Sequence, residues 1–191
     1  MNLLLVNGHE YWESSPGQLN ETLLQESIKW FEDKNYSVKT THTNKEYDLE
    51  EEVLKILWAD IIIYFSPVYW MSIPASMKRY FDHVYAKGRG RIFENDGRDN
   101  GGQYGTGGLM SNKKYMLITT WNAPSEAFNH DIQFLFEGKN VDDVFFNFHS
   151  MQKFIGMKKL KSFSLFDVKR NPKIEQFLIG LRNHLNDNIN D

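Results

Sequence analysis

Hydrophobic positions along this chain follow two patterns, short continuous apolar runs and longer stretches in which apolar residues recur every three or four positions. The runs at 2–6 and 61–65 are almost wholly apolar, which is typical of strands buried on both faces of a sheet. Residues 36–43 alternate and are rich in β-branched side chains, and 115–120 and 160–166 are the other strand candidates. We therefore predict five strands.

The segments between these strands have the periodicity of amphipathic helices. We expect helices from Asn20, over 48–58 with Asp48 as N-cap, from Pro74 to about Tyr85, over 141–151, and over 174–185. The alternation predicts a doubly wound α/β fold, a five-stranded parallel sheet with right-handed crossovers and helices on both faces. In its flavodoxin-like version the strand order is 2-1-3-4-5. No second core is visible, so we expect one domain over residues 1–191.

One insertion, residues 86–112, interrupts this pattern and holds eight of the 13 glycines. A loop of this length in a compact domain is usually functional or disordered, and its composition does not say which. The stretch Gly105–Gly108 resembles a phosphate-binding loop, but it follows no predicted strand and precedes no predicted helix. A flexible loop is the preferred interpretation from the residues alone.

Composition narrows the chemistry. The chain has 22 Lys and Arg against 25 Asp and Glu, a net charge of -3, and no basic stripe, so we expect no nucleic-acid partner. It has no cysteine, which excludes disulfides, thiol redox chemistry and cysteine-ligated metal, so any redox function needs a bound organic cofactor. The six histidines lack metal-ligand spacing, and neither a GxSxG nucleophile motif nor an acid pair is identifiable. We expect no metal site.

The first apolar run is short and lacks a basic flank, unlike a signal peptide. No run approaches the ~20 apolar residues of a membrane span. We therefore expect a cytoplasmic protein without membrane insertion.

In open α/β sheets, ligands bind at the carboxyl ends of the strands, where the strand order reverses. The loops at that edge are 9–18, 66–73 and 121–125. In the first, Ser14, Ser15 and the free amides of the following helix could receive an anion, although a plain capped helix start explains the same residues. The Walker and GxGxxG motifs are absent, which disfavours ATP and Rossmann-type dinucleotide sites.

The other two loops carry aromatic residues directly after a strand. Tyr69 and Trp70 follow the central strand, where they either pack in the loop or cover a flat cofactor. Trp121 and Asn122 follow the fourth strand, and loop amides there could bond to the N5 and O4 edge of an isoalloxazine ring.

Four stretches together make the chain recognisable: SSPGQLNETL, LWADIIIYFSPVYWMSIPASMKRYFDHVY, YGTGGLMSNKKYMLITTWNAPSEAF and VDDVFFNFHSMQKFIGMKKL. With these the sequence resembles the modulator of drug activity B family, flavodoxin-like NAD(P)H:quinone reductases, over nearly its whole length. The resemblance implies FAD, a homodimer, and two-electron reduction of quinones by NADPH or NADH. No residue can be assigned to the nicotinamide ribose, so the sequence does not choose between the two donors.

The resemblance also implies site residues. Those around the flavin are Ser15, Gly17, Gln18, Leu19, Asn20, Thr22, Pro67, Val68, Tyr69, Trp70, Met71, Tyr104, Trp121, Asn122, Ala123 and Pro124. Within this set Trp121 and Asn122 would support the reacting edge of the ring, and Tyr104 gives the insertion a role. Phe128 would help to wall the substrate site.

We expect a ping-pong cycle in which a nicotinamide passes a hydride to flavin N5 and leaves, and a quinone then takes the hydride at the same site. Two alternatives remain open. One is an electron-carrier flavodoxin with FMN, which the modest charge of -3 disfavours. The other is a flavin-binding regulatory subunit of a membrane transporter, without significant turnover.

Overall fold

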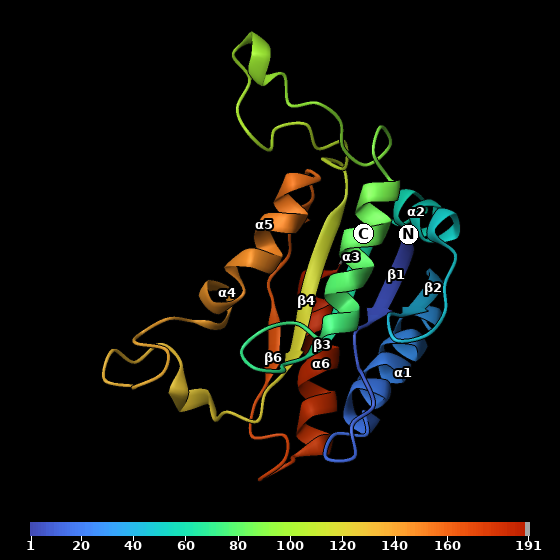
Figure 1. Cartoon of the computed structure of the whole chain (residues 1–191). Coiled ribbons are helices and arrows are strands. Elements are labelled where there is room, and N and C mark those ends of the chain that lie inside the picture. Colours follow the sequence, from blue (N-terminus) through green and yellow to red (C-terminus); the bar gives the residue numbers. More distant parts are fainter. Residues whose placement is uncertain (190–191) are drawn as a thin grey trace.

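The computed structural model of this protein describes residues 1–189, which form a parallel sheet wrapped by helices (Figure 1). The strands are β1 (Asn2–Asn7), β2 (Ser37–His42), β3 (Ile61–Pro67), β4 (Lys114–Thr120), β5 (Lys158–Lys159) and β6 (Phe163–Leu165). Every pairing is parallel, and the order is β2-β1-β3-β4-β5, with β6 also on β4. The predicted flavodoxin-like order is thus confirmed.

The predicted fifth strand, 160–166, is wrong in extent. Within it only Phe163–Leu165 (β6) is a strand, and a second short strand, Lys158–Lys159 (β5), precedes it. Lys159 pairs with Tyr115, and Phe163 pairs with Ile118. The chain therefore advances four residues from β5 to β6 while β4 advances three. The extra residue is a bulge, which interrupts the ladder and divides the strand.

Helices cover both faces of the sheet (Figure 1). They are α1 (Gln18–Glu32), α2 (Leu49–Trp58), α3 (Ala75–Lys87), α4 (Val141–Val144), α5 (Phe146–Phe154) and α6 (Ile174–Asn188), with short 3₁₀ helices at Arg98–Asn100 and Ser125–Ala127. One core packs α1 and α6 on one face of the sheet, and the other core packs α2, α3 and α5 on the opposite face. All seven residues of β3 are buried between the two cores, as its apolar run predicts.

The single helix predicted over 141–151 is also wrong. It breaks at Phe145, whose φ of -91° and ψ of 20° leave the helical region between α4 and α5. Phe145 is buried with its ring 5.7 Å from that of Trp121. The break therefore brings a ring from this segment against the loop that follows β4.

The glycine-rich insertion joins the end of α3 to the start of β4, so it lies at the amino ends of the strands (Figure 1, green to yellow-green, top). It is tied to α5 by the Met110 amide, which donates to the carbonyl of Ile155 at 2.9 Å. Gly108 is required at this contact because a Cβ would lie 2.3 Å from the Gly156 nitrogen. Within residues 1–189, no helix combines the length and the apolar character needed to cross a membrane.

Candidate functional site

The three loops at the carboxyl ends of β1, β3 and β4 meet around one cavity of about 540 Å³. Each predicted loop contributes, and the segment after β6 adds a fourth side. The lining consists of Trp12, Ser14, Ser15, Pro67, Val68, Tyr69, Trp70, Thr120, Asn122, Val168 and Lys169. A cavity of this size at the switch point of the sheet is large enough for a cofactor.

The first loop is a tight turn followed by a left-handed glycine. The amides and carbonyls of Trp12 and Ser15 bond to each other at 3.2 and 2.8 Å. Gly17 precedes α1 with φ of 85°, and a Cβ there would lie 2.0 Å from the His9 ring. That ring is held 3.0 Å from the Ser15 carbonyl. Only glycine fits this position, for both backbone and space.

No side chain caps the start of α1. The alternative to an anion site was a helix start capped by a side chain. At α1 no such cap is present. The first-turn amides of Gln18, Leu19 and Asn20 lack the side-chain acceptor that Ser, Thr, Asp or Asn usually provides. Thr22 does not serve, since its hydroxyl donates to the Gln18 carbonyl at 2.8 Å. This helix start carries a partial positive charge suited to a phosphate.

Asn20 is buried at 3% exposure beside this helix start. Its Oδ1 accepts a hydrogen bond from the Thr120 hydroxyl at 2.9 Å, and Thr120 lines the cavity. Its Nδ2, by contrast, has no hydrogen-bond partner among the described residues. A buried unpaired donor costs about 1–3 kcal/mol, which an oxygen of a bound ligand would recover. The residues of the first loop therefore fit the phosphate of a flavin nucleotide.

The second loop turns through two consecutive non-glycine residues in the left-handed region, Trp70 with φ of 50° and Met71 with φ of 62°. The backbones of Tyr69 and Ser72 close this turn with two hydrogen bonds of 3.1 Å. Such backbone strain is typical of ligand-binding loops. Trp70 lines the cavity although its residue is 94% exposed, so a large aromatic surface stands open at the rim.

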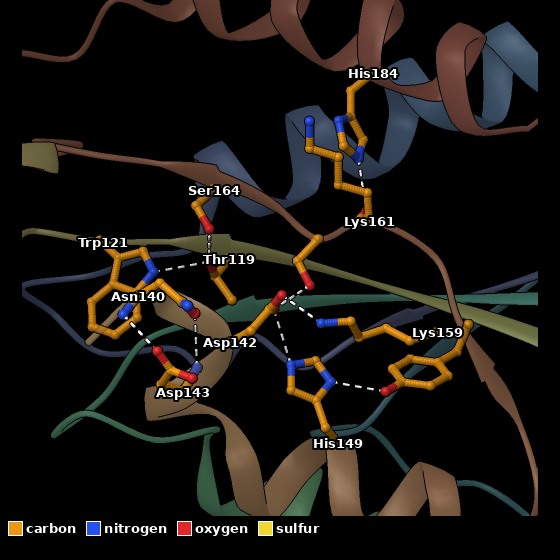
Figure 2. Close-up of polar contacts among 12 residues, drawn as sticks. Thr119, Trp121, Asn140, Asp142, Asp143, His149, Lys159, Lys161, Ser164 and His184 are labelled. Atoms are coloured by element: carbon orange, nitrogen blue, oxygen red, sulfur yellow. Dashed lines mark hydrogen bonds and ion pairs between the residues drawn. The ribbon is translucent and has the colours of Figure 1, made fainter. Parts of the chain in front are cut away.

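The third loop is fixed through Trp121, which is buried. Its Nε1 donates to the Thr119 hydroxyl at 2.9 Å, and that hydroxyl lies 2.8 Å from Ser164 Oγ (Figure 2). Its backbone amide donates to the Leu165 carbonyl at 2.8 Å. Trp121 therefore supports the loop from the core, and Asn122 lines the cavity, whereas Ala123 and Pro124 are not among its lining residues.

Several predicted residues do not line the cavity, and among them are Phe128 and Tyr104. Phe128 is 1% exposed, stacks on Phe136 with centroids 4.4 Å apart, and contacts the ring of Trp121 at 4.8 Å. It backs the third loop from within the core. Tyr104 lies in the insertion at the other end of the sheet, 5.7 Å from the ring of Phe154. The structure does not bring Tyr104 to the three loops of its own chain.

Glu10 was not predicted, yet it connects two of the loops. Its carboxylate accepts a hydrogen bond from the Ser76 amide in the first turn of α3, and its carbonyl accepts from the Tyr69 hydroxyl at 3.1 Å. The signal available in the sequence is Pro74, which starts a helix without a side-chain acceptor of its own. Nothing local indicates that the missing acceptor comes from 66 residues away.

A second polar cluster anchors α4 and α5 to the sheet (Figure 2). Asp142 lies 3.0 Å from His149 Nε2, 2.5 Å from Lys159 Nζ and 2.6 Å from Ser162 Oγ, and His149 Nδ1 lies 2.8 Å from the Tyr115 hydroxyl. The hydrogen bond with His149 is the chief reason that the pKa of Asp142 is far below its usual value. Burial raises the pKa of Tyr115, so this hydroxyl is no ready nucleophile. Within residues 1–189, no group of His, Asp and Glu could hold a metal ion.

Known proteins resemble this chain along its length. A family model described as a flavodoxin-like fold matches residues 1–185. The chain is 40% identical over 188 residues to the NADPH:quinone oxidoreductase MdaB of Haemophilus influenzae, covering 97% of each protein.

Solved structures agree in fold. A candidate quinone reductase of Klebsiella pneumoniae has a TM-score of 0.77 at 21% identity, covering 97% of this chain and 84% of that one. The general stress protein 14 of Treponema denticola, in complex with FMN, has a TM-score of 0.69 at 15% identity, covering 97% and 95%. At such identities the likeness concerns the fold alone.

Proposed function

This chain belongs to the family with a flavodoxin-like fold, and we propose that it is an FAD-dependent NAD(P)H:quinone oxidoreductase. The observation that carries the proposal is the three-loop cavity with its open aromatic rim. Next to it lie an uncapped helix start, which suits a nucleotide phosphate, and Asn20, whose Nδ2 is unpaired and whose Oδ1 bonds to the cavity residue Thr120. The 40% identity to an NADPH:quinone oxidoreductase over 97% of both chains supports the reaction class.

In this proposal the amides at the start of α1, with Ser15 and Asn20, hold the phosphate. Pro67 to Met71 and Asn122 to Pro124 hold the two edges of the ring, while Trp121 fixes the second of these segments from below. The flavin supplies the hydride carrier between a nicotinamide and a quinone, which take turns at one face of the ring. The protein therefore needs no side-chain nucleophile, only positioning and exclusion of water.

We propose FAD rather than FMN on the strength of the family resemblance. The cavity continues past the third loop to Val168 and Lys169, which gives a longer nucleotide a further wall. The alternative cofactor is FMN, which is bound in the structure of the Treponema denticola protein. Chromatography of acid-released cofactor against FAD and FMN standards would decide between them.

We also propose a homodimer in which Tyr104 completes the site of the partner subunit. Tyr104 is largely exposed and belongs to the insertion, which lies at the end of the sheet opposite the three loops (Figure 1). A tyrosine of the insertion can therefore reach a flavin only if two chains pack with opposite ends adjacent. A two-fold axis between the subunits produces this arrangement at both sites.

The test of the whole proposal is a steady-state assay of FAD-loaded protein with NADPH and NADH against a panel of short quinones. Parallel reciprocal plots are expected for a ping-pong cycle. Protein that cannot be loaded with any flavin would overturn the proposal. Flavin-loaded protein without turnover would instead favour the regulatory subunit of a transporter. The proposal includes a cytoplasmic location, which cell fractionation would test.

A further inference from the structure

We infer that Lys169 binds a phosphate group of the flavin nucleotide, an inference that rests on the proposed function. Lys169 lies in the segment after β6, which the family resemblance did not assign to the site. It lines the same cavity as Ser14 and Ser15, the residues next to the start of α1. The cavity thus has a cation on the side formed by the segment after β6.

The backbone around Lys169 is held in place by the third loop. The amide of Val168 donates to the Trp121 carbonyl, and the amide of Asp167 donates to the Ala123 carbonyl, both at 3.1 Å. Asp167 itself has φ of 54°, a left-handed corner that non-glycine residues rarely adopt. Two backbone bonds and a strained corner therefore set where the Lys169 side chain starts, directly beside the cavity.

Charge supports the same role. Among the residues described as lining this cavity, Lys169 is the single charged one, and none is acidic. Within residues 1–189, no carboxylate forms an ion pair with Lys169. The uncapped start of α1 follows Ser14 and Ser15 in the chain, and Asn20 bonds to Thr120, so both lie behind residues that line the cavity. An anion in the cavity would meet the charge of Lys169, with the positive end of α1 close behind Ser15, and no carboxylate in the lining.

If Lys169 is only a solvated surface residue, its substitution will leave cofactor binding unchanged. If it binds phosphate, its substitution will weaken binding, so a binding experiment distinguishes the two roles. We would measure the dissociation constants of FAD, FMN and riboflavin by quenching of flavin fluorescence, for the wild type, K169Q and R170Q. Arg170 is the matched control because it is the neighbouring exposed cation and does not line the cavity. Both substitutions remove one positive charge.

K169Q should weaken FAD binding by up to about tenfold, because a charge-assisted bond to phosphate is lost at an exposed site. Riboflavin, which has no phosphate, should bind all three proteins equally, and R170Q should bind FAD as the wild type does. A loss for FMN as well as FAD assigns the contact to their shared phosphate, and a loss for FAD alone assigns it to the second phosphate. Equal melting temperatures of the apoproteins would show that the fold is unaffected.

Unchanged FAD binding by K169Q, or an equal loss in R170Q, would overturn the role of Lys169. A wild type that binds no flavin would instead contradict the proposed function, so the two failures are distinguishable.

Discussion

The carboxylate of Glu10 accepts a hydrogen bond from the backbone amide of Ser76, so the loop after β1 caps the helix that follows β3. The backbone carbonyl of Glu10 also accepts a hydrogen bond from the Tyr69 hydroxyl. Glu10 therefore joins two of the three cavity loops, through its side chain and through its backbone carbonyl.

Glu10→Ala should weaken FAD binding and lower the free energy of unfolding by about 1 kcal/mol, the usual effect of a lost helix cap. Titration with FAD and urea unfolding of the apoprotein measure the two effects. Glu13→Ala is the control, because Glu13 is an exposed acid in the same loop. If E10A and E13A bind FAD equally well, Glu10 does not set the loop spacing.

Gly17→Ala should destabilise the protein by about 1–2 kcal/mol, since φ of 85° disfavours any Cβ and the His9 ring occupies its space. FAD affinity should fall with it, because the start of α1 must shift. The double variant H9A/G17A removes the clash and leaves the backbone strain, so it should recover part of the loss relative to H9A. A G17A protein with wild-type unfolding and affinity would contradict this account.

Asp142 should make the stability of the fold depend on pH. Its pKa is held far below the usual value, mainly by His149. A carboxyl with a lowered pKa stabilises the fold at pH values above its unfolded pKa, and this contribution is lost as the pH falls through the folded one. The wild type should therefore lose stability below about pH 4.

Asp142→Asn should be less stable by about 1–2 kcal/mol at neutral pH, because charged hydrogen bonds are lost at a partly exposed site. Its stability should also change less with acid than that of the wild type. Urea unfolding across a pH series measures both, with Asp99→Asn, an exposed residue of the insertion, as control. Parallel pH curves for D142N and the wild type would show that Asp142 is not the titrating group.

Tyr104 can be tested by complementation between subunits. Tyr104→Ala and Asn122→Trp should each be inactive as homodimers, the first lacking the aromatic residue and the second having its cavity filled. Co-expressed and randomly assembled, they should recover about a quarter of wild-type activity, since half the dimers hold one intact site of two. No recovery would mean that Tyr104 does not act across the interface.

The parts of the fold that the sequence predicts are those set by local pattern. The apolar run of Ile61–Phe65 predicts a central buried strand, and parallel topology then brings the loops after β1, β3 and β4 to one edge. Six of the sixteen predicted flavin residues line the cavity, namely Ser15, Pro67, Val68, Tyr69, Trp70 and Asn122.

The parts that pattern does not predict depend on contacts distant in sequence. The break at Phe145 coincides with packing of its ring on Trp121, and the bulge before Phe163 is defined by register with β4. Lys169 reaches the cavity because backbone bonds join its segment to the third loop, which no periodicity encodes. Trp121 and Phe128 are buried although they lie in or just after the third cavity loop. The neighbouring sequence does not indicate that these two side chains point into the core.

The insertion at the amino ends of the strands has a consequence for how the protein would behave in a cell. If Tyr104 serves only the neighbouring chain, a lone subunit is half of an active site, and two halves must meet before either can work. At concentrations well below the dimer dissociation constant, total turnover would then rise with the square of the amount of protein made. A small change in expression would become a larger change in the capacity to reduce quinones.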